Sequence, residues 1–118
     1  MLLSAAIVGN NYMNLIEIEA EINEWQSRNF PNAKSYQPLL GAVEEMGELS
    51  HAHLKMEQGI RGTPMEHLMK KKDSVGDILI YLVHYCKLNG FTMEECLATA
   101  WHEVKQRDWI MNKQDGTV

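Results

Sequence analysis

The chain has 118 residues and a formal net charge of -5 at pH 7. This length suits one domain, and the acidic balance excludes duplex nucleic acid as the main partner, because duplex binding needs a basic face. Cys86 and Cys96 form no Cys-x-x-Cys pair and are too few for a disulfide framework. We therefore expect reduced thiols and a cytoplasmic protein with no nucleic-acid partner.

The N-terminal residues 1–13 are expected to form an extension outside the domain. The stretch Leu2–Val8 is apolar but too short to cross a membrane, and no Lys or Arg precedes it as in a signal peptide. The sequence therefore predicts a frayed or packed extension and no membrane partner.

Residues 14–118 predict a single all-α domain, of which the first half holds two helices. The first is expected from about Asn14 to Asn29, because apolar residues recur there at helical spacing and Pro31 disfavours helix in the residue before it. The second is expected from near Pro38, a favoured first-turn residue, to Gly59.

Two further helices are predicted in the second half of the chain. Thr63 followed by Pro64 and Glu66 forms a helix start, and that helix is expected to end at Asn89-Gly90, with a possible break near Lys70–Lys72. Thr92 and Glu95 start a fourth helix, which is expected to carry Trp101, Val104 and Trp109. No hairpin signal or internal repeat is identified.

Carboxylates recur at four-residue spacing on the second and third predicted helices. Glu44 and Glu48 form one such pair with Glu45 between them, and Asp73 and Asp77 form another. Like charges at this spacing are mildly destabilising, and neither pair has an opposite charge four residues later. The pattern favours a hard divalent cation with oxygen ligands, Mg²⁺ with Mn²⁺ as a possible substitute, over the alternative of a solvated acidic face.

The helical spacing also predicts which faces are buried. On the second helix, an apolar face of Leu39, Ala42, Val43, Met46 and Leu49 lies opposite the glutamates and is expected in the core. Small residues beside the glutamates, Gly41 and Ala52, are expected to leave room for a ligand. On the third helix, Ile80, Tyr81 and His84 continue the acidic face as an apolar strip, which predicts a subunit interface.

A carboxylate-bound Mg²⁺ usually acts on substrate phosphates, and basic residues are available to bind them. These candidates are Lys55, Arg61, Lys105 and Arg107. A di-iron site is disfavoured, because the Glu-x-x-His spacing of Glu48 and His51 occurs on one helix where that site needs two.

The motif Glu44-Glu45-x-x-Glu48, followed by an acidic residue and Gly76-Asp77, resembles the signature of MazG-like nucleoside triphosphate pyrophosphohydrolases, which are all-α. The resemblance covers roughly Trp25 to Trp109. It also includes Gly47-Glu48-Leu49, Lys55…Gln58-Gly59, Asp77–Leu82, Glu94–Leu97 and Glu103-Val104-Lys105-x-Arg107. One departure is Ser74, where the commonest second motif has glutamate and this chain has its acid one residue earlier, at Asp73.

The resemblance implies hydrolysis of a nucleoside triphosphate between its α- and β-phosphates. It implies Glu44, Glu48 and Asp77 as Mg²⁺ ligands, Asp73 as a ligand directly or through water, and Glu45 as a ligand of a further metal or as the general base. Lys55, Lys105 and Arg107 would then neutralise phosphate charge, and Trp25, Asn29 and Phe30 would hold the base. The family assembles as homodimers or homotetramers in which paired helices form a four-helix bundle, which agrees with the apolar strip.

Alternatives remain open within and beyond the enzyme class. Within it, the chain could be a phosphoribosyl-ATP pyrophosphohydrolase or a narrow dUTP or dCTP hydrolase, because one or two pocket contacts decide the base and sugar. Beyond it, a non-catalytic metal-binding helical oligomer is possible, although such a module does not need five converging carboxylates.

Overall fold

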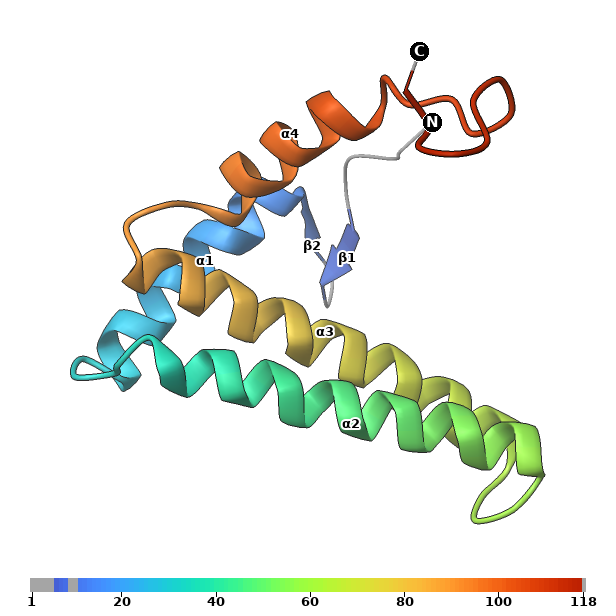
Figure 1. The fold of residues 1–118 in the computed structure, drawn as a ribbon. Coiled ribbons are helices and arrows are strands. Elements are labelled where there is room, and N and C mark those ends of the chain that lie inside the picture. The colour runs from blue at the N-terminus through green and yellow to red at the C-terminus, as the bar shows by residue number, and fades with distance from the viewer. Residues whose placement is uncertain (1–5, 9–10, 118) are drawn as a thin grey trace.

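Four helices and a short β-hairpin follow one another along the chain in the computed structural model (Figure 1), which describes residues 6–8 and 11–117 and the side chains of residues 13–117. The elements are β1 (Ala6–Val8), β2 (Asn11–Met13), α1 (Leu15–Asn29), α2 (Tyr36–Gln58), α3 (Pro64–Leu88) and α4 (Met93–Val104). The all-α class is confirmed, with the hairpin as an addition. Among the described residues, no helix is long and apolar enough to span a membrane.

The hairpin was not expected from the sequence. Strands β1 and β2 pair antiparallel, with Ala6 opposite Met13 and Val8 opposite Asn11. Two residues, Gly9-Asn10, separate the strands in the sequence, and this dipeptide is typical of a two-residue hairpin connection. The statement that the sequence has no hairpin signal is therefore wrong for residues 6–8 and 11–13, the extension over residues 1–13 stays a prediction, and residues 1–5 and 9–10 lie outside the described part of the chain.

The helices begin where capping side chains satisfy their first backbone N–H groups. The side chains of Asn14, Thr63 and Thr92 accept hydrogen bonds from the backbone N–H groups three residues later, at the starts of α1, α3 and α4. Helix α2 ends at Gly59, whose φ of 68° is the left-handed conformation that glycine adopts without strain. These helix ends agree closely with the sequence predictions.

Two details of the helices differ from the predictions. Helix α3 continues through Lys70–Lys72, where a break was considered, because no proline or glycine interrupts it there. Helix α4 ends at Val104, so Trp109 lies in the turns that follow it rather than on the helix.

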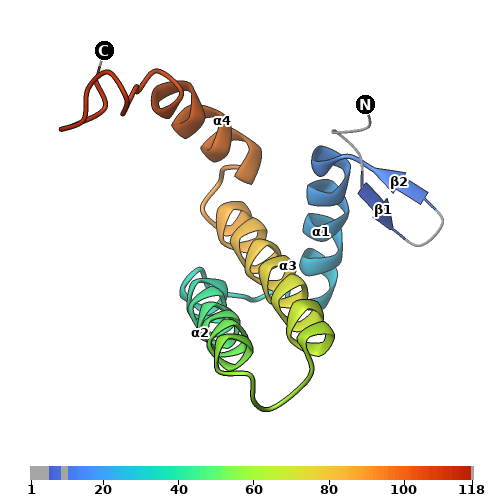
Figure 2. The ribbon, with the colours of Figure 1, turned by 90° about the vertical axis from the view of Figure 1, so that its right-hand side faces the viewer.

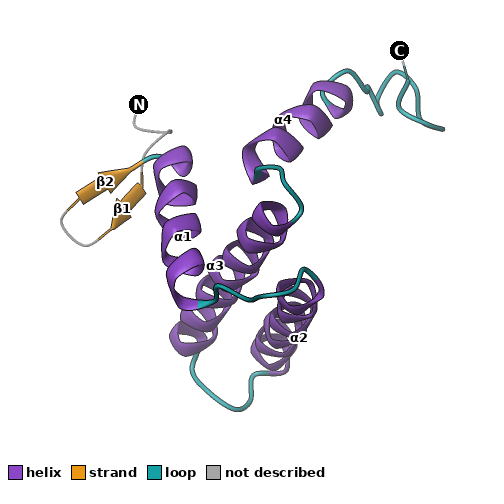
Figure 3. Cartoon of the chain, turned by 90° about the vertical axis from the view of Figure 1, so that its left-hand side faces the viewer, coloured by secondary structure: helices purple, strands orange, loops and turns teal. Residues whose placement is uncertain are grey.

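Helices α2 and α3 form a long antiparallel pair, and α1 packs across one end of α3 (Figures 1 and 2). Helix α4 leaves the end of α3 and diverges from α1 (Figure 3). The buried Glu19 of α1 contacts the first turn of α4. Its carboxylate accepts hydrogen bonds from the backbone N–H groups of Met93 (2.6 Å) and Glu94 (3.4 Å). This carboxylate lies at the positive end of α4, where an anion stabilises a helix.

Small side chains on α2 allow α2 and α3 to approach closely. Ala42 and Ala52 are buried on α2, and Gly41 lies against the ring of Tyr81 on α3. A Cβ atom added at Gly41 would lie 2.6 Å from the Cζ atom of Tyr81. Gly41 and Glu44 also line a hollow of about 610 Å³, and Ala52 and Glu48 line another of about 410 Å³, so both small residues border open space beside the glutamates, as expected.

The apolar face of α2 that was expected in the core is largely exposed. Leu39, Val43 and Met46 are 41%, 63% and 50% exposed, and of the five residues predicted there only Ala42 is buried. The prediction failed because helical spacing separates two faces without saying which one packs inward. Here the face with small residues and glutamates packs against α3, because small side chains permit the closer approach.

The strip on α3 that was expected at a subunit interface contacts α1 and α2 of the same chain. The backbone carbonyl of Ile80 accepts a hydrogen bond from Gln26 Nε2 on α1 (3.0 Å), and His84 is buried beside Phe30, with ring centroids 6.2 Å apart. The unpartnered apolar side chains lie elsewhere on the α2–α3 pair, at Leu39, Leu40, Val43, Met46, Leu54, Leu68, Val75 and Leu79.

Candidate functional site

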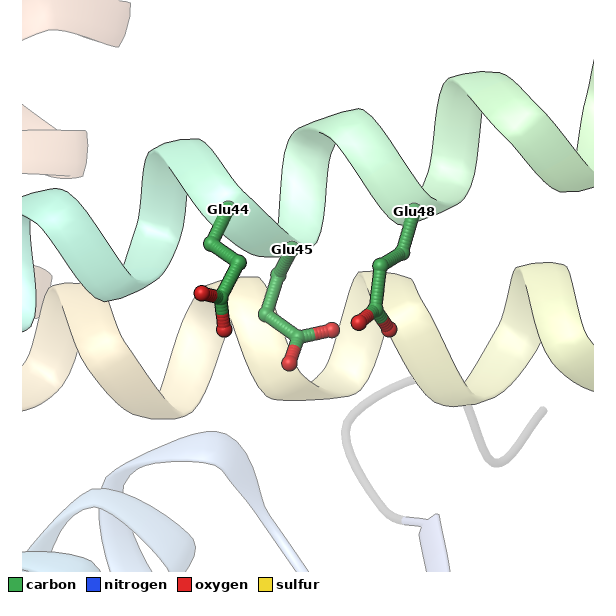
Figure 4. Close-up of side chains that lie close together, drawn as sticks. All are labelled: Glu44, Glu45 and Glu48. Carbon is green, nitrogen blue, oxygen red and sulfur yellow. The ribbon is translucent and has the colours of Figure 1, made fainter.

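Three glutamates of α2 bring their carboxylates together on the side of the helix that faces α3 (Figure 4). Oxygen atoms of Glu44, Glu45 and Glu48 all lie within 4.8 Å of one another. The spacing follows from helix geometry, since residues three and four apart share a face. Three carboxylates this close repel one another unless a cation lies between or beside them.

Lys70 on α3 supplies part of the missing positive charge. Its Nζ atom lies 3.2 Å from Glu48 Oε2, and the hydrogen bond to Glu48 raises the pKa of Lys70 above its usual value. The prediction that the glutamates have no countercharge is therefore wrong for Glu48. The partner was missed because it comes from α3, whereas the sequence comparison considered only the same helix. Both side chains are about half exposed, so solvent screens the pair and it adds little to stability.

Glu45 is the most enclosed of the three glutamates. Its Oε2 atom is buried and has no hydrogen-bond partner among the described residues. Burial raises the pKa of Glu45, and the negative charges of Glu48 and Asp77 raise it further, while Lys70 opposes them. A buried carboxylate oxygen without a partner is costly, so this atom is placed to bind a cation or to take up a proton.

A cavity of about 610 Å³ opens beside Glu45, between α1, α2 and α3. Asp77 and His84 lie about two turns apart on α3, so the cavity has a polar end, with Glu45 near Asp77, and an aromatic end, with Phe30 beside His84. Glu21 also lines the cavity. Trp25 and Phe30 meet edge to face with ring centroids 5.6 Å apart. The remaining lining residues are Ile22, Gln26, Ile80 and Tyr81. An apolar hollow with a few convergent polar groups is the usual form of a small-molecule site.

The structure separates the two aspartates of α3. Asp77 is half-buried, lines the cavity with Glu45 and is close enough for its charge to act on that carboxylate. Asp73 is exposed and lies outside both the glutamate cluster and the cavity. Neither aspartate belongs to the cluster of Glu44, Glu45 and Glu48, and Asp77 is the one whose charge acts on Glu45 at the cavity.

Ser74, rather than Asp73, occupies the position of α3 that packs inward. It is completely buried, and its hydroxyl oxygen has no hydrogen-bond partner among the described residues. Residues three apart share a helix face, so Ser74 falls on the face of Asp77. The sequence resemblance had placed a glutamate at this position in the commonest motif, and this chain has a shorter polar group there.

The predicted phosphate-binding residues are not gathered at the cavity. Lys55 Nζ donates to Gln58 Oε1 on its own helix (2.9 Å), and Lys105 and Arg107 follow α4, which diverges from α2 (Figure 1). Of the basic groups, Lys70, which was not predicted, contacts Glu48, and Arg61 borders a smaller hollow that Glu48 and Lys70 also line.

The predicted base-binding residues divide in the same way. Trp25 and Phe30 line the cavity, whereas Asn29 Nδ2 donates to the Trp25 backbone carbonyl (2.8 Å) on the exposed surface of α1. Gln26 and His84 line the cavity and were not predicted. Burial lowers the pKa of His84, which keeps its imidazole neutral near pH 7. His84 had been assigned to the apolar strip of an expected subunit interface, and Gln26 is not one of the apolar residues that recur along the first predicted helix.

The donor set of the glutamate cluster fits a hard divalent cation. It consists of carboxylate oxygens alone, one of them buried and unpartnered, and such oxygens suit Mg²⁺ or Mn²⁺ better than zinc or copper. In comparisons with known proteins, no family model, no curated protein and no solved structure matches this chain.

Proposed function

We propose that this protein is a Mg²⁺-dependent nucleoside triphosphate pyrophosphohydrolase that cleaves between the α- and β-phosphates. The observation that carries the proposal is one cavity with two ends of different chemistry. Glu45 and Asp77 lie at one end, and Trp25 and Phe30 lie at the other. A nucleotide has the same division, because its phosphates need cations and carboxylate-bound metal while its base favours aromatic contact.

In this proposal Glu44, Glu48 and Asp77 hold the metal ion, with Mn²⁺ as a possible substitute. When bound, Mg²⁺ supplies positive charge to the phosphates and makes a nearby water more acidic. Asp73, exposed and apart from the cluster, would act at most through water. Lys70 and Arg61 contribute positive charge beside Glu48 for the leaving pyrophosphate.

Glu45 is the proposed general base. Its raised pKa gives the carboxylate a greater tendency to take up a proton than an ordinary surface glutamate. It would remove a proton from the water that attacks the α-phosphorus. The new bond joins the water oxygen to that phosphorus, the bond to the bridging oxygen breaks, and pyrophosphate departs with the bonding electrons. Glu45 then holds the proton until solvent removes it.

The sequence resemblance, together with the exposed apolar side chains of α2 and α3, also supports a proposal on assembly and cellular role. We propose a MazG-like assembly in which these side chains pair with those of a second copy, as a homodimer or homotetramer, in a protein that controls cytoplasmic nucleotide pools. Lys55, Lys105 and Arg107, which lie away from the cavity of their own chain, would then serve a site that a neighbouring subunit completes.

The test is a panel of common ribonucleoside and deoxyribonucleoside triphosphates, together with phosphoribosyl-ATP, incubated with Mg²⁺ and scored for both phosphate products. We expect pyrophosphate and a nucleoside monophosphate from at least one substrate, and no turnover with EDTA. Orthophosphate as the primary product would place cleavage at the wrong bond. Metal binding without turnover of any substrate would instead identify a non-catalytic metal-binding protein.

A further inference from the structure

Gln26 presents a hydrogen-bond acceptor that the rest of the chain does not use. Its side chain is only 2% exposed, and its Nε2 atom donates to the backbone carbonyl of Ile80 at 3.0 Å. A carbonyl only accepts, so the amide nitrogen must face Ile80 and the amide oxygen must point elsewhere. That Oε1 atom is buried and has no hydrogen-bond partner in the part of the chain that the structure describes.

An unpartnered buried acceptor needs an explanation. Leaving such an atom unsatisfied costs about 1–3 kcal/mol, which is a substantial fraction of the stability of a small domain. Gln26 lines the same cavity as Glu45 and Asp77, and its neighbours there include Trp25, Phe30 and His84. Gln26 contacts Ile80, which lies between Asp77 and His84 on α3, so Gln26 lies midway along the cavity lining, next to the aromatic end where the proposed function locates the base of a nucleotide.

We propose that Gln26 Oε1 accepts a hydrogen bond from the exocyclic amino group of the substrate base, so that the enzyme prefers cytosine or adenine to the matching oxo bases. This inference rests on the proposed function, because it names the base that the same cavity selects. Gln26 is thereby a specificity-determining residue, while the carboxylates at the other end of the cavity carry out hydrolysis.

The amino group fits better than a ring N–H for a steric and an electrostatic reason. Oε1 is buried and unpartnered, in a residue that lines the cavity. An exocyclic amino group projects beyond the ring and can reach a buried acceptor, whereas the imide N–H of uracil or thymine is flanked by two carbonyl oxygens that project further than it does. Replacing the amino group by an oxo group would also set two acceptors against each other, leaving both without a hydrogen bond.

The test compares substrates that differ only in this group, CTP with UTP and ATP with ITP, through kcat/KM for pyrophosphate release. For at least one pair we expect the wild-type protein to favour the amino base by about 10-fold or more, since a site built around a hydrogen bond discriminates strongly against its absence. In Gln26→Leu the ratio should fall toward one, through a higher KM for the amino substrate and a smaller change in kcat.

Gln106→Leu provides the matched control. Gln106 also donates its Nε2 to a backbone carbonyl, that of His102 at 3.0 Å, but it is exposed and follows α4. The substrate ratio should be unchanged in this variant. Circular dichroism and thermal unfolding establish whether Gln26→Leu folds, and the wild-type ratio tests the inference without any variant.

The outcomes separate this inference from the proposed function. Two results overturn the role of Gln26 and leave the hydrolase intact. One is turnover in which the wild-type kcat/KM ratio of amino to oxo substrate is near one or favours the oxo base. The other is a ratio that stays at the wild-type value in folded Gln26→Leu. If no nucleotide is hydrolysed, the proposed function fails, and equilibrium binding of the same four nucleotides with Mg²⁺ decides the inference. Tighter binding of CTP or ATP than of its partner supports it, and equal or absent binding overturns it.

Discussion

The environment of Glu45 suits two roles that one carboxylate cannot perform at the same time, a metal ligand and a general base. Its carboxylate is destabilised by burial and by the charges of Glu48 and Asp77, and all three effects raise its pKa. A cation would relieve that destabilisation by attraction, and a proton would relieve it by neutralisation. The same environment therefore suits a metal ligand or a general base, and a substitution that removes the charge while keeping the shape distinguishes the two roles.

Glu45→Gln makes that distinction. If Glu45 is the base, turnover should fall by about 10²–10⁴ while Mg²⁺ and nucleotide binding remain close to wild type, because glutamine keeps the shape but cannot take up the proton. Single-turnover kinetics measures the chemical step, and calorimetric titration measures binding. Loss of binding together with turnover would assign Glu45 to the metal instead.

The sequence predicted which carboxylates of α2 lie together, but it did not predict which side chains of α3 lie beside them. Spacing along one helix was enough to predict that Glu44, Glu45 and Glu48 share a face, and the structure brings their oxygens together. Spacing contains no information about the opposing helix. For that reason it missed Lys70, which approaches Glu48 from α3, and it did not separate Asp73 from Asp77.

At the level of helices, the ends of α2, α3 and α4 were predictable from the sequence, but the packing of α2 against α3 was not. Helix ends were predictable from local chemistry, since Thr63, Thr92 and Gly59 act within one turn of themselves. The apolar pattern of α2 did not predict which face packs against α3, because small side chains allow a closer approach of the two helices than large apolar ones. Gly41 is the clearest example, since the ring of Tyr81 occupies the space that a side chain would need.

Two glycines of α2 test this packing. Gly41→Ala should lower the free energy of unfolding by about 1–3 kcal/mol, because the new methyl group forces the Tyr81 ring to move. Gly47→Ala is the matched control, since no other side chain or element lies within 4 Å of a Cβ atom added there. It should raise the free energy of unfolding by about 0.5–1 kcal/mol through helix propensity. Urea unfolding measures both, and equal effects would contradict the close α2–α3 contact.

Across the described residues, large apolar side chains are exposed on all four helices and in the segment after α4, and α2 and α3 carry many of them. They include Val43 at 63% exposed, Met46 at 50% and Val75 at 46%. At about 25 cal/mol per Å² of buried apolar surface, covering several such residues contributes a few kcal/mol, a large share of a small domain's stability. A second copy of the chain offers the same side chains, and pairing the two sets gives a two-fold contact.

We therefore expect light scattering at micromolar concentration to report a homodimer or homotetramer. Val43→Asp should dissociate the assembly and lower activity with it, because a charge at this position would have to be buried without a partner. Ile110→Asp is the control, since Ile110 is 82% exposed in the segment after α4, outside α2 and α3. A monomeric wild-type protein with full activity would show that these side chains need no second copy.

The most direct test of the central claim compares pyrophosphate release by Asp77→Asn and Asp73→Asn under saturating Mg²⁺. Asp77 lines the cavity beside Glu45, and Asp73 is exposed one helical turn away, so the two variants make the same chemical change inside and outside the site. The account predicts a loss of about 10²-fold or more for Asp77→Asn, because the neutral amide removes a metal-binding charge. It predicts a much smaller loss for Asp73→Asn. Wild-type activity in Asp77→Asn would contradict the account.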